Sequence, residues 1–486
     1  MRAAAAPTCP VKLLSYAGLH EHNHAFGRDN SRDGMRFEIA RQIAMKRRCV
    51  VIIGGGFSGV AVAAHLAARP HAPRIVLLER SRRLGVGLAY GTPDSEHVLN
   101  VRASGMSFRA DSPDHFSAWL KGKTDAPATA FATRRTYGQY LGDQFARARG
   151  FLSRRIKCMR GEAIACRPVE GGWSVELASG QTLSADAVVL AIGHRKPSSL
   201  PAFEAAEIPL IDAWDRAALH RMPRGDILLL GAGLTMVDVA LSLAARRRAG
   251  TIYALSRRGL TPRPHLDPPA PPPPGPLDLP LTLSDAVFAF RSEVGRMAER
   301  GQPWQLAMER MRHHTAAYWR RLPLETQRRF LRHLRPWWDV HRHRMAPEIA
   351  AKVEALTSSG RLRVLAGEIV SAEAHRRGYS VQHRQRGSMV RHKIDIAAIV
   401  NCTGGDLDVS RSTDPLLMQL LSDGLVRPSP NGLGIDLDAD ARVISADGAV
   451  SGNFYVIGSL TQGAFWESTA VPDLRVWAAA IAEHVS

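Results

Sequence analysis

Three glycines that follow a short apolar run have the spacing of a phosphate-binding loop. Gly54, Gly56 and Gly59 come directly after residues 50–53, and an alanine-rich run continues to Ala68. In a strand–turn–helix unit the first glycine permits the tight turn, the second lets backbone amides approach a pyrophosphate, and the third lets the helix pack closely on the strand. Phosphates then lie at a helix N-terminus, where free N–H groups and the helix dipole favour anions. The pattern therefore predicts a dinucleotide-binding loop.

A carboxylate stands at the position where the ribose of a dinucleotide is expected. Residues 75–78 form a second apolar strand pattern that ends in Glu79, 20 residues after Gly59. A carboxylate at this distance can accept hydrogen bonds from ribose hydroxyls. The alternative is an ordinary glycine turn followed by a solvated strand end, but the full strand–helix–strand context favours the nucleotide site.

The chain contains a second copy of this unit, which is stronger evidence than either copy alone. Residues 227–230 precede Gly231 and Gly233, a helix is expected to reach Ala245, and residues 251–255 give the second strand. The offset from the first glycine to the residue that ends the second strand, Glu79 in one copy and Ser256 in the other, is 25 residues in both. A repeat of this kind is typical of two structurally equivalent domains.

The two copies also match further along the chain. Residues 161–193 and 367–404 each begin with Gly-Glu, continue through an alternating, hairpin-like stretch, and end in an apolar strand followed by a glycine. Two such units predict two nucleotide-binding domains. We therefore expect an α/β fold with two Rossmann-like dinucleotide-binding domains, the second inserted in the first, together with a helical insertion.

The second copy differs from the first at the position expected to contact the ribose. Ser256 replaces the carboxylate of Glu79 and is followed by Arg257 and Arg258. Guanidinium groups make charge-assisted, bidentate contacts with phosphate, so this change suits a 2′-phosphate and favours NADPH over NADH. The alternative is that these are two more arginines of an arginine-rich chain.

Composition argues against several classes of function. The 486 residues carry a formal net charge of +19, which is compatible with a polyanionic partner. Only 8 of the 64 basic residues are lysine. No nucleic-acid-binding module accompanies the charge, so we expect no nucleic-acid partner. The five cysteines form no C-x-x-C pair, which argues against a disulfide framework, a zinc ribbon and a dithiol reductase.

The beginning of the chain carries no targeting signal that we can identify. The first 45 residues lack both a secretory apolar segment and apolar periodicity, and we expect a disordered extension there. A start at Met45 would place residues 1–44 outside the native protein. Residues 49–68 carry no Asp, Glu, Lys or Arg, but four glycines argue against a membrane-spanning helix. The sequence thus predicts a soluble, cytoplasmic protein without a membrane partner.

A proline-rich stretch separates the second glycine unit from a helical region. Residues 261–280 contain 10 prolines, which predicts an extended connector. Residues 281–357 have a helical pattern rich in arginine, histidine and tryptophan. This region would form either a basic cap over an anionic cofactor or substrate, or a solvated helical face with a tryptophan core. On a helix His341 and His343 diverge by about 200°, so we expect no metal site with Asp339.

With two Rossmann-like units in one chain, the sequence resembles the flavoproteins that have two dinucleotide-binding domains. Segments 85–90, 97–107, 233–238 and 338–344 are more specifically similar to a bacterial branch of FAD/NAD(P)-binding proteins. That branch includes FAD-dependent urate hydroxylases and L-aspartate N-monooxygenases. The resemblance covers residues 46–486 and does not identify a substrate.

The resemblance implies FAD in the first domain and a nicotinamide cofactor in the second. An apolar strand that enters Gly458, followed by a helix from Val471 to His484, looks like the C-terminal element that returns to the FAD domain in these proteins. They usually carry Asp after that glycine, whereas Ser459 here cannot supply a carboxylate contact to the ribitol.

The resemblance also sets the expected domain bounds. We expect the disordered extension at 1–45, the first part of the FAD-binding domain at 46–224, the NAD(P)-binding domain at 225–398, and the rest of the FAD-binding domain at 399–486.

The residues expected to bind FAD and NAD(P)H come from both glycine units, the strand ends and the segments that carry the resemblance. They are Gly54, Gly56, Phe57, Ser58, Gly59, Glu79, Arg80, Asn100, Ser107, Gly193, Gly231, Gly233, Leu234, Thr235, Arg257, Arg258, Gly404, Gly458 and Ser459. By the same resemblance Gln462, Trp466 and Glu467 are expected beside the substrate. The sequence identifies no catalytic acid or base. His265 is a candidate proton-transfer group, with a structural histidine as the alternative.

A chain that binds both cofactors is expected to pass hydride from NAD(P)H to the flavin. Without a cysteine pair the electrons go to O2 or to an external acceptor, and we expect an FAD-dependent monooxygenase that acts on a small anionic substrate. Urate hydroxylation to 5-hydroxyisourate is the first hypothesis, because the urate anion suits a basic pocket.

Three alternatives to urate hydroxylation stay open. They are N-hydroxylation of an amino acid such as L-aspartate, an NAD(P)H-dependent flavin oxidoreductase that serves a partner protein, and an FAD-binding regulator without turnover. The sequence also leaves open whether the chain forms a homo-oligomer.

Overall fold

The computed structural model describes residues 48–151, 155–246, 249–312 and 314–485. The extension expected at 1–45 and the start expected at Met45 lie outside these residues. Within them, no helix is both long enough and apolar enough to cross a membrane. The described residues form one compact unit, which contains three sheets.

The first sheet surrounds the first glycine unit, with the strand order β15–β16–β7–β1–β2–β3. β1 (Cys49–Ile53) pairs in parallel with β2 (Arg74–Glu79) and β7 (Ala187–Leu190). All five residues of β1 are buried, as in a parallel sheet that is covered on both faces. The remaining strands are β3 (Ile156–Arg160), β15 (Arg442–Ile444) and β16 (Val450–Val456).

The last segment of the chain returns to this first sheet. β16 runs parallel to β7, and α16 (Val471–Val485) contacts α2 (Phe57–Ala67), the helix that follows the first glycine loop. The other helices and 3-10 turns of this part are η1 (Ala103–Gly105), α3 (His115–Thr124), α4 (Arg134–Phe151), η2 (Val409–Arg411), α14 (Pro415–Ser422), η3 (Ser459–Thr461) and α15 (Gln462–Phe465). A small antiparallel sheet of β4 (Ala163–Val169), β5 (Gly172–Leu177) and β6 (Thr182–Ala185) forms the first expected hairpin.

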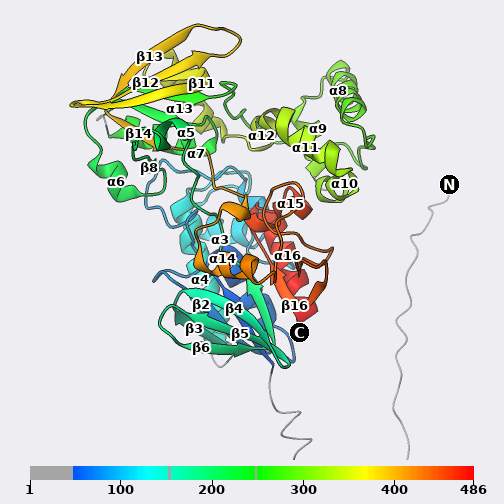
Figure 1. The fold of residues 1–486 in the computed structure, drawn as a ribbon. Helices are drawn as coiled ribbons and strands as arrows, with labels where there is room; N and C mark the ends of the chain where they lie inside the picture. Colours follow the sequence, from blue (N-terminus) through cyan, green and yellow to red (C-terminus); the bar gives the residue numbers. More distant parts are fainter. Residues whose placement is uncertain (1–47, 152–154, 247–248, 313, 486) are drawn as a thin grey trace, which may run out of the picture. The chain divides into compact units, whose positions relative to one another are not determined.

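The second sheet contains the second glycine unit, with the order β13–β12–β11–β10–β9–β14–β8. β9 (Gly225–Leu230), α7 (Leu234–Ala245) and β10 (Ala249–Ser256) repeat the strand, helix and strand of the first unit. β11 (Leu362–His375), β12 (Gly378–Gln385) and β13 (Arg391–Ile396) form the second hairpin and lie side by side in yellow in Figure 1. The short elements before β9 are α5 (Pro201–Glu204), β8 (Ile211–Asp212) and α6 (Arg216–Arg221). The expected α/β fold with two Rossmann-like units is confirmed.

The strands of the second sheet extend past both ends of the range 225–398 that we expected for the nicotinamide domain. β14 (Ala398–Asn401) pairs in parallel with β9, and β8 pairs with β14 at the edge of the sheet. All four residues of β14 are buried, which suits a central strand. The strands of this sheet therefore span residues 211–401.

Between β10 and β11 the chain forms a connector and a group of helices. Residues 261–280 contain no helix or strand apart from one bridge between Pro264 and Met345. The helices that follow, here called the insertion, are α8 (Leu283–Glu299), α9 (Gln305–Arg312), α10 (Thr315–Arg321), α11 (Leu324–His333), α12 (Arg335–Arg342) and α13 (Pro347–Ser358). They occupy the region whose sequence pattern predicted helix.

Buried polar contacts hold the second glycine unit against the first. The hydroxyl of Ser242, on α7, donates to the carboxylate of Asp94 at 2.6 Å and lies 2.9 Å from Nε2 of His97. Asp238, on the same helix, pairs with Arg134 of α4 at 3.1 Å. The Asp238 and Arg134 side chains are 12% and 13% exposed, so this ion pair is largely shielded from water.

We expect Asp238→Asn to destabilise the protein, because Arg134 would keep a buried charge without its partner. Removing one partner of a buried ion pair costs about 3 kcal/mol or more. The matched control is Lys352→Met, which removes a more exposed pair between Lys352 and Glu96 at 2.7 Å. Exposed pairs contribute about 1 kcal/mol or less. Differential scanning calorimetry measures both variants, and equal losses of Tm would contradict the assigned role of the Asp238–Arg134 pair.

Candidate cofactor sites and active site

The first glycine loop has open space at Gly56, where a phosphate can approach the backbone. At Gly54 and Gly59 a side chain would clash with neighbouring backbone atoms. Gly54 has a φ of +109°, and a Cβ there would lie 2.3 Å from the carbonyl oxygen of Ala191. A Cβ on Gly59 would lie 1.9 Å from the carbonyl oxygen of Gly54. A Cβ on Gly56 would meet only Gly87 Cα, at 3.7 Å. The loop thus combines a tight turn, close helix packing and an open approach to the backbone.

The N-terminus of α2 is available to an anion. It has no side-chain cap and no acidic residue in its first turn, so the N–H groups of residues 57–59 lack the partners that usually satisfy a helix end. The carboxylate of Glu79 lies beside the loop and accepts from the N–H of Gly55 at 2.7 Å and of Ser81 at 2.8 Å. Each carboxylate oxygen keeps a lone pair for a ribose hydroxyl. These groups fit the adenosine diphosphate part of FAD.

The C-terminal segment meets the same loop. Gly458 has a φ of +102°, and a Cβ there would lie 3.6 Å from Oγ of Ser58. The buried hydroxyl of Ser459 donates to the carbonyl oxygen of Gly193 at 2.7 Å. Segments that are far apart in the sequence therefore come together at the ends of β1, β7 and β16. Arg80, directly after β2, is exposed.

Asn100 and Ser107 make structural contacts. The fully buried hydroxyl of Ser107 donates to the carbonyl oxygen of Ser112 at 2.6 Å and so shapes the turn that follows. The carbonyl oxygen of Asn100 lies 2.9 Å from Nε2 of His265, a geometry that calls for a ring N–H. Burial, assisted by Arg344, lowers the pKa of His265 to about 4, so the imidazole is neutral near pH 7. These contacts favour the structural alternative for His265.

A cavity of about 1210 Å³ opens at the second glycine unit. Gly231, with a φ of +100°, and Gly233 line it, and no side chain caps α7, whose first turn contains Leu234 and Thr235. Gly404, after β14, lines the same cavity. This arrangement repeats that of the first unit and fits a second dinucleotide, so we call it the nucleotide cavity.

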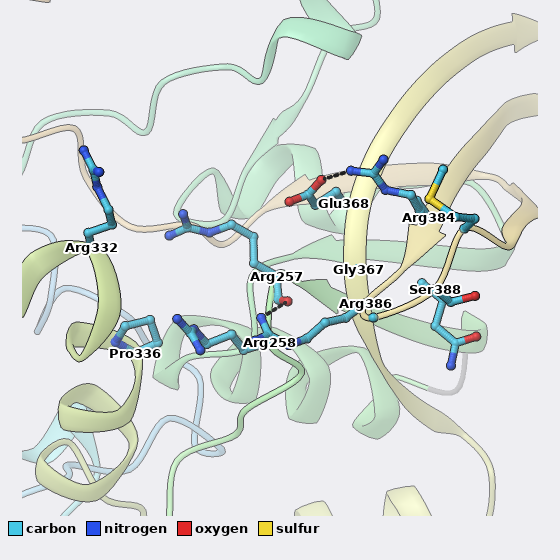
Figure 2. A pocket seen from close by; sticks show the side chains of 12 residues that line it. Arg257, Arg258, Arg332, Pro336, Gly367, Glu368, Arg384, Arg386 and Ser388 are labelled. Atoms are coloured by element: carbon cyan, nitrogen blue, oxygen red, sulfur yellow. Dashed lines mark hydrogen bonds and ion pairs between the residues drawn. The ribbon is translucent and has the colours of Figure 1, made fainter.

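A smaller cavity of about 550 Å³ shares part of its lining with the nucleotide cavity and is rich in arginine, as Figure 2 shows. Its five arginines are Arg257 and Arg258 after β10, Arg332 on α11, and Arg384 and Arg386 at the end of β12. Glu368 is the only carboxylate among its described lining residues, and it pairs with Arg384 at 2.7 Å. This surplus of guanidinium groups suits a phosphate dianion.

Sequence reasoning found two of these five arginines. Arg332, Arg384 and Arg386 are distant from Arg258 in the chain, and only the folding of α11 and of the β12–β13 hairpin brings them to the cavity. The local excess of arginine in the insertion was the one available signal, and it did not single out Arg332.

The insertion also contacts the loop between η3 and α16, here called the C-terminal loop. Trp466, with a φ of +47°, stacks on Trp319 of α10 with ring centroids 5.0 Å apart. Glu467 accepts from Nε1 of Trp338 at 2.8 Å and pairs with Arg342 at 3.0 Å, both on α12. Trp466 and Glu467 are both buried.

The carboxylate of Glu467 makes its contacts with other residues of this chain. Burial acts to raise its pKa, but the neighbouring Arg342 and His343 outweigh burial and lower the pKa below its usual value. The carboxylate is therefore ionised, and both of its oxygens have partners within the chain. Of the three residues expected beside the substrate, Trp466 and Glu467 thus fasten the insertion to the C-terminal loop, while Gln462 is half-buried at the start of α15.

Helix α12 forms one wall of the nucleotide cavity. Arg335, Pro336, Asp339 and Val340 line it, which supports the interpretation of the insertion as a cap over a cofactor. Burial raises the pKa of Asp339 above its usual value. In the sequence, Asp339 enters only as part of a metal site that we did not expect to form. Among the described residues, no group of three or more His, Cys, Asp or Glu side chains is placed to hold a metal ion.

Comparison with known proteins agrees with this assignment of the first unit. Residues 51–195 match a family model described as FAD-NAD(P)-binding. No curated protein matches the chain.

The fold is shared by solved structures of two kinds, hydroxylating enzymes and a reductase. L-lysine 6-monooxygenase from Pseudomonas syringae is 17% identical, with a TM-score of 0.61 over 90% of this chain and 98% of that chain. Ornithine hydroxylase from Pseudomonas aeruginosa is 15% identical, with a TM-score of 0.61 over 90% of this chain and 100% of that chain. Thioredoxin reductase from T. acidophilum is 11% identical, with a TM-score of 0.50 over 90% of this chain and 98% of that chain. At these identities the likeness shows the fold alone.

The FAD-NAD(P)-binding family model thus matches the part of the chain that contains the first glycine loop, and the fold as a whole is shared with the solved structures above. The expected cofactor pair, FAD and NAD(P)H, is confirmed.

We expect Arg257→Gln to raise the KM for NADPH by about 10-fold or more while the KM for NADH stays unchanged. The physical reason is that a charge-assisted hydrogen bond contributes about 1.5–3 kcal/mol, and only NADPH has the 2′-phosphate that would accept it. Steady-state flavin reduction with each nucleotide measures the effect. The matched control is Arg329→Gln, an exposed arginine on α11 that lines neither cavity. A wild-type protein that prefers NADH would refute the NADPH assignment.

Proposed function

We propose that the chain is an FAD-dependent monooxygenase that uses NADPH and O2 to hydroxylate a nitrogen atom of a small amine. The observation that carries the proposal is the likeness in fold to the lysine and ornithine hydroxylases, whose TM-scores of 0.61 exceed the 0.50 of thioredoxin reductase at the same 90% coverage of this chain. The arginine-lined cavity supports NADPH as the electron donor.

When bound, FAD accepts hydride from NADPH and activates O2. The chain's own residues hold the two cofactors and limit the entry of water. The insertion does this by forming a wall of the nucleotide cavity and by stacking Trp319 on Trp466 of the C-terminal loop. Water exclusion matters in such a site because it prevents hydrolysis and other side reactions of activated oxygen.

The substrate is the point at which the proposal departs from the first sequence hypothesis. Urate hydroxylation finds no support among the matched structures described above, whereas two of them are named as amine hydroxylases. The arginines that suggested an anionic substrate gather where the 2′-phosphate of NADPH is expected. N-hydroxylation, the first alternative to urate, is therefore the better-supported reaction.

A flavin-dependent reductase that serves a partner is the second candidate. The likeness to thioredoxin reductase favours it, although the TM-score is lower, at 0.50. Against it, Cys49, Cys158, Cys166 and Cys402 form no disulfide among the described residues. The chain thus offers no cysteine pair there to relay electrons.

The proposal is tested with purified, FAD-loaded protein and a panel of L-ornithine, L-lysine, L-aspartate and urate. We expect one amine to stimulate NADPH and O2 consumption in a one-to-one ratio and to yield a product heavier by one oxygen, because one atom of O2 enters the substrate and the other leaves as water. Oxygen uptake and product mass are the measurements.

Different outcomes separate the hypotheses. A heavier product from urate would return the assignment to urate hydroxylation. Peroxide formation with every compound, together with fast reduction of an artificial electron acceptor, would favour the reductase.

A further inference from the structure

Four carboxylates among the described residues line the nucleotide cavity, and they differ in how closely other residues of the chain contact them. Glu368 pairs with Arg384 at 2.7 Å, and Asp406 pairs with Arg411 at 3.0 Å. Asp408 accepts from the hydroxyl of Ser410 at 2.6 Å. Asp339 has only longer contacts, of 3.5 Å to Nε of Arg335 and 3.9 Å to Nε2 of His343. Of these four carboxylates, Asp339 has the most freedom to bind a ligand.

Asp339 is also accessible from the cavity. Its side chain lines the cavity wall and is 40% exposed, so an occupant of the cavity can reach it. Behind it, His343 lies 3.9 Å from Asp339 and 3.9 Å from Glu467. An imidazole between two carboxylates can hold or pass on a proton.

The charges around Asp339 come from three parts of the chain. Arg335 and His343 lie on or directly after its own helix, Glu467 faces it from the C-terminal loop, and Arg257 and Arg258 line the same cavity. Burial raises the pKa of Asp339, and Glu467 adds to the increase, while His343 and Arg335 oppose it. A carboxylate with a raised pKa is a stronger base than an ordinary one, which suits general-base chemistry.

Hydroxylation of a protonated amine requires a group that accepts a proton. An ammonium nitrogen has no lone pair, so it must lose a proton before a nitrogen–oxygen bond can form. Overall, one ammonium, one O2 and one NADPH give one hydroxylamine, one water and one NADP+, and this equation balances in atoms and charge without any further proton. The nitrogen gives up two N–H protons in this conversion, and they are balanced by the hydroxyl proton of the hydroxylamine and by one proton of the water that forms as the oxygen–oxygen bond breaks.

We propose that Asp339 accepts the proton of a primary ammonium substrate and returns it to the departing oxygen, with His343 as the residue that positions the carboxylate. The proposal rests on the proposed N-hydroxylation and names its substrate class as a cationic amine. The nitrogen lone pair forms the new bond to one oxygen of O2, NADPH supplies both electrons, and the second oxygen leaves as water.

The central test is Asp339→Asn in the FAD-loaded protein, with the amine that the wild type hydroxylates best among L-ornithine, L-lysine and L-aspartate. General-base catalysis contributes about 10²–10⁴-fold, so we expect hydroxylamine formation at pH 7.5 to fall by about 100-fold. NADPH oxidation should continue and yield peroxide, because the amine stays protonated while the glycine loop and the arginines assigned to the nucleotide are unchanged. His343→Gln should show a smaller loss in the same direction.

The pH profile separates loss of a base from structural damage. In the wild type, hydroxylation should fall as the pH drops through the pKa of Asp339, because the protonated carboxyl cannot accept another proton. In Asp339→Asn the ratio of hydroxylamine to NADPH consumed should recover as the pH rises toward 9.5, since bulk hydroxide then deprotonates the amine. A structural defect would not recover in this way.

Two controls accompany these variants. Glu325→Gln makes the same carboxylate-to-amide change at an exposed position on α11 and should behave as wild type. FAD content, read from the flavin absorbance, checks that each variant folds, and Asp339→Glu keeps a carboxylate in case the amide variant does not.

The outcomes distinguish this inference from the proposed function. If the wild type forms hydroxylamine and Asp339→Asn keeps the wild-type ratio at pH 7.5, the role of Asp339 is refuted and the function stands. The role is also refuted if the ratio falls but does not recover at high pH. If the wild type hydroxylates none of the amines, the function and the role of Asp339 are refuted together.

Discussion

The contact between Glu467 and helix α12 is the constraint on which the arrangement of the site depends. Glu467 belongs to the C-terminal loop, while Arg342 and Trp338 belong to an insertion more than a hundred residues earlier in the chain. A buried carboxylate without a partner is strongly unfavourable. Separating α12 from the C-terminal loop would leave the Glu467 charge without its partners. Because α12 also lines the nucleotide cavity, this one contact fixes the cavity wall relative to the first domain.

Most of the fold could be predicted from the sequence, since its signals are local. The buried strands, the glycine turns and the helices after them have short-range patterns, and the repeated spacing identified the second unit as a copy of the first. The site was less predictable because its walls come from distant segments. No local sequence pattern indicates that Glu467 contacts Arg342. Likewise, nothing in the sequence around Arg384 indicates that the folded hairpin places it in the same cavity as Arg257. An apolar strand alone does not reveal its sheet, so the sequence could not show that β14, which begins at residue 398, pairs with β9.

The net charge of +19 acquires a more specific meaning in the folded protein. Many arginines are matched by nearby carboxylates, as in the pairs of Arg442 with Asp438 and of Arg427 with Asp436. The smaller cavity is different, because it holds five arginines and one carboxylate. Such a concentration raises the local potential and attracts phosphate groups. Under the proposed function, a bound nucleotide would account for part of the excess charge.

The position of β16 between β7 and β15 has a consequence for how the protein is made. The first sheet begins with residues near the start of the described chain and is completed by residues 442–456, after the whole second unit has been synthesised. Contacts of such long sequence separation form slowly, whereas the second unit is continuous in the chain and depends on nearer partners. On the ribosome, the nicotinamide domain can therefore assemble before β16 is available to complete the first sheet.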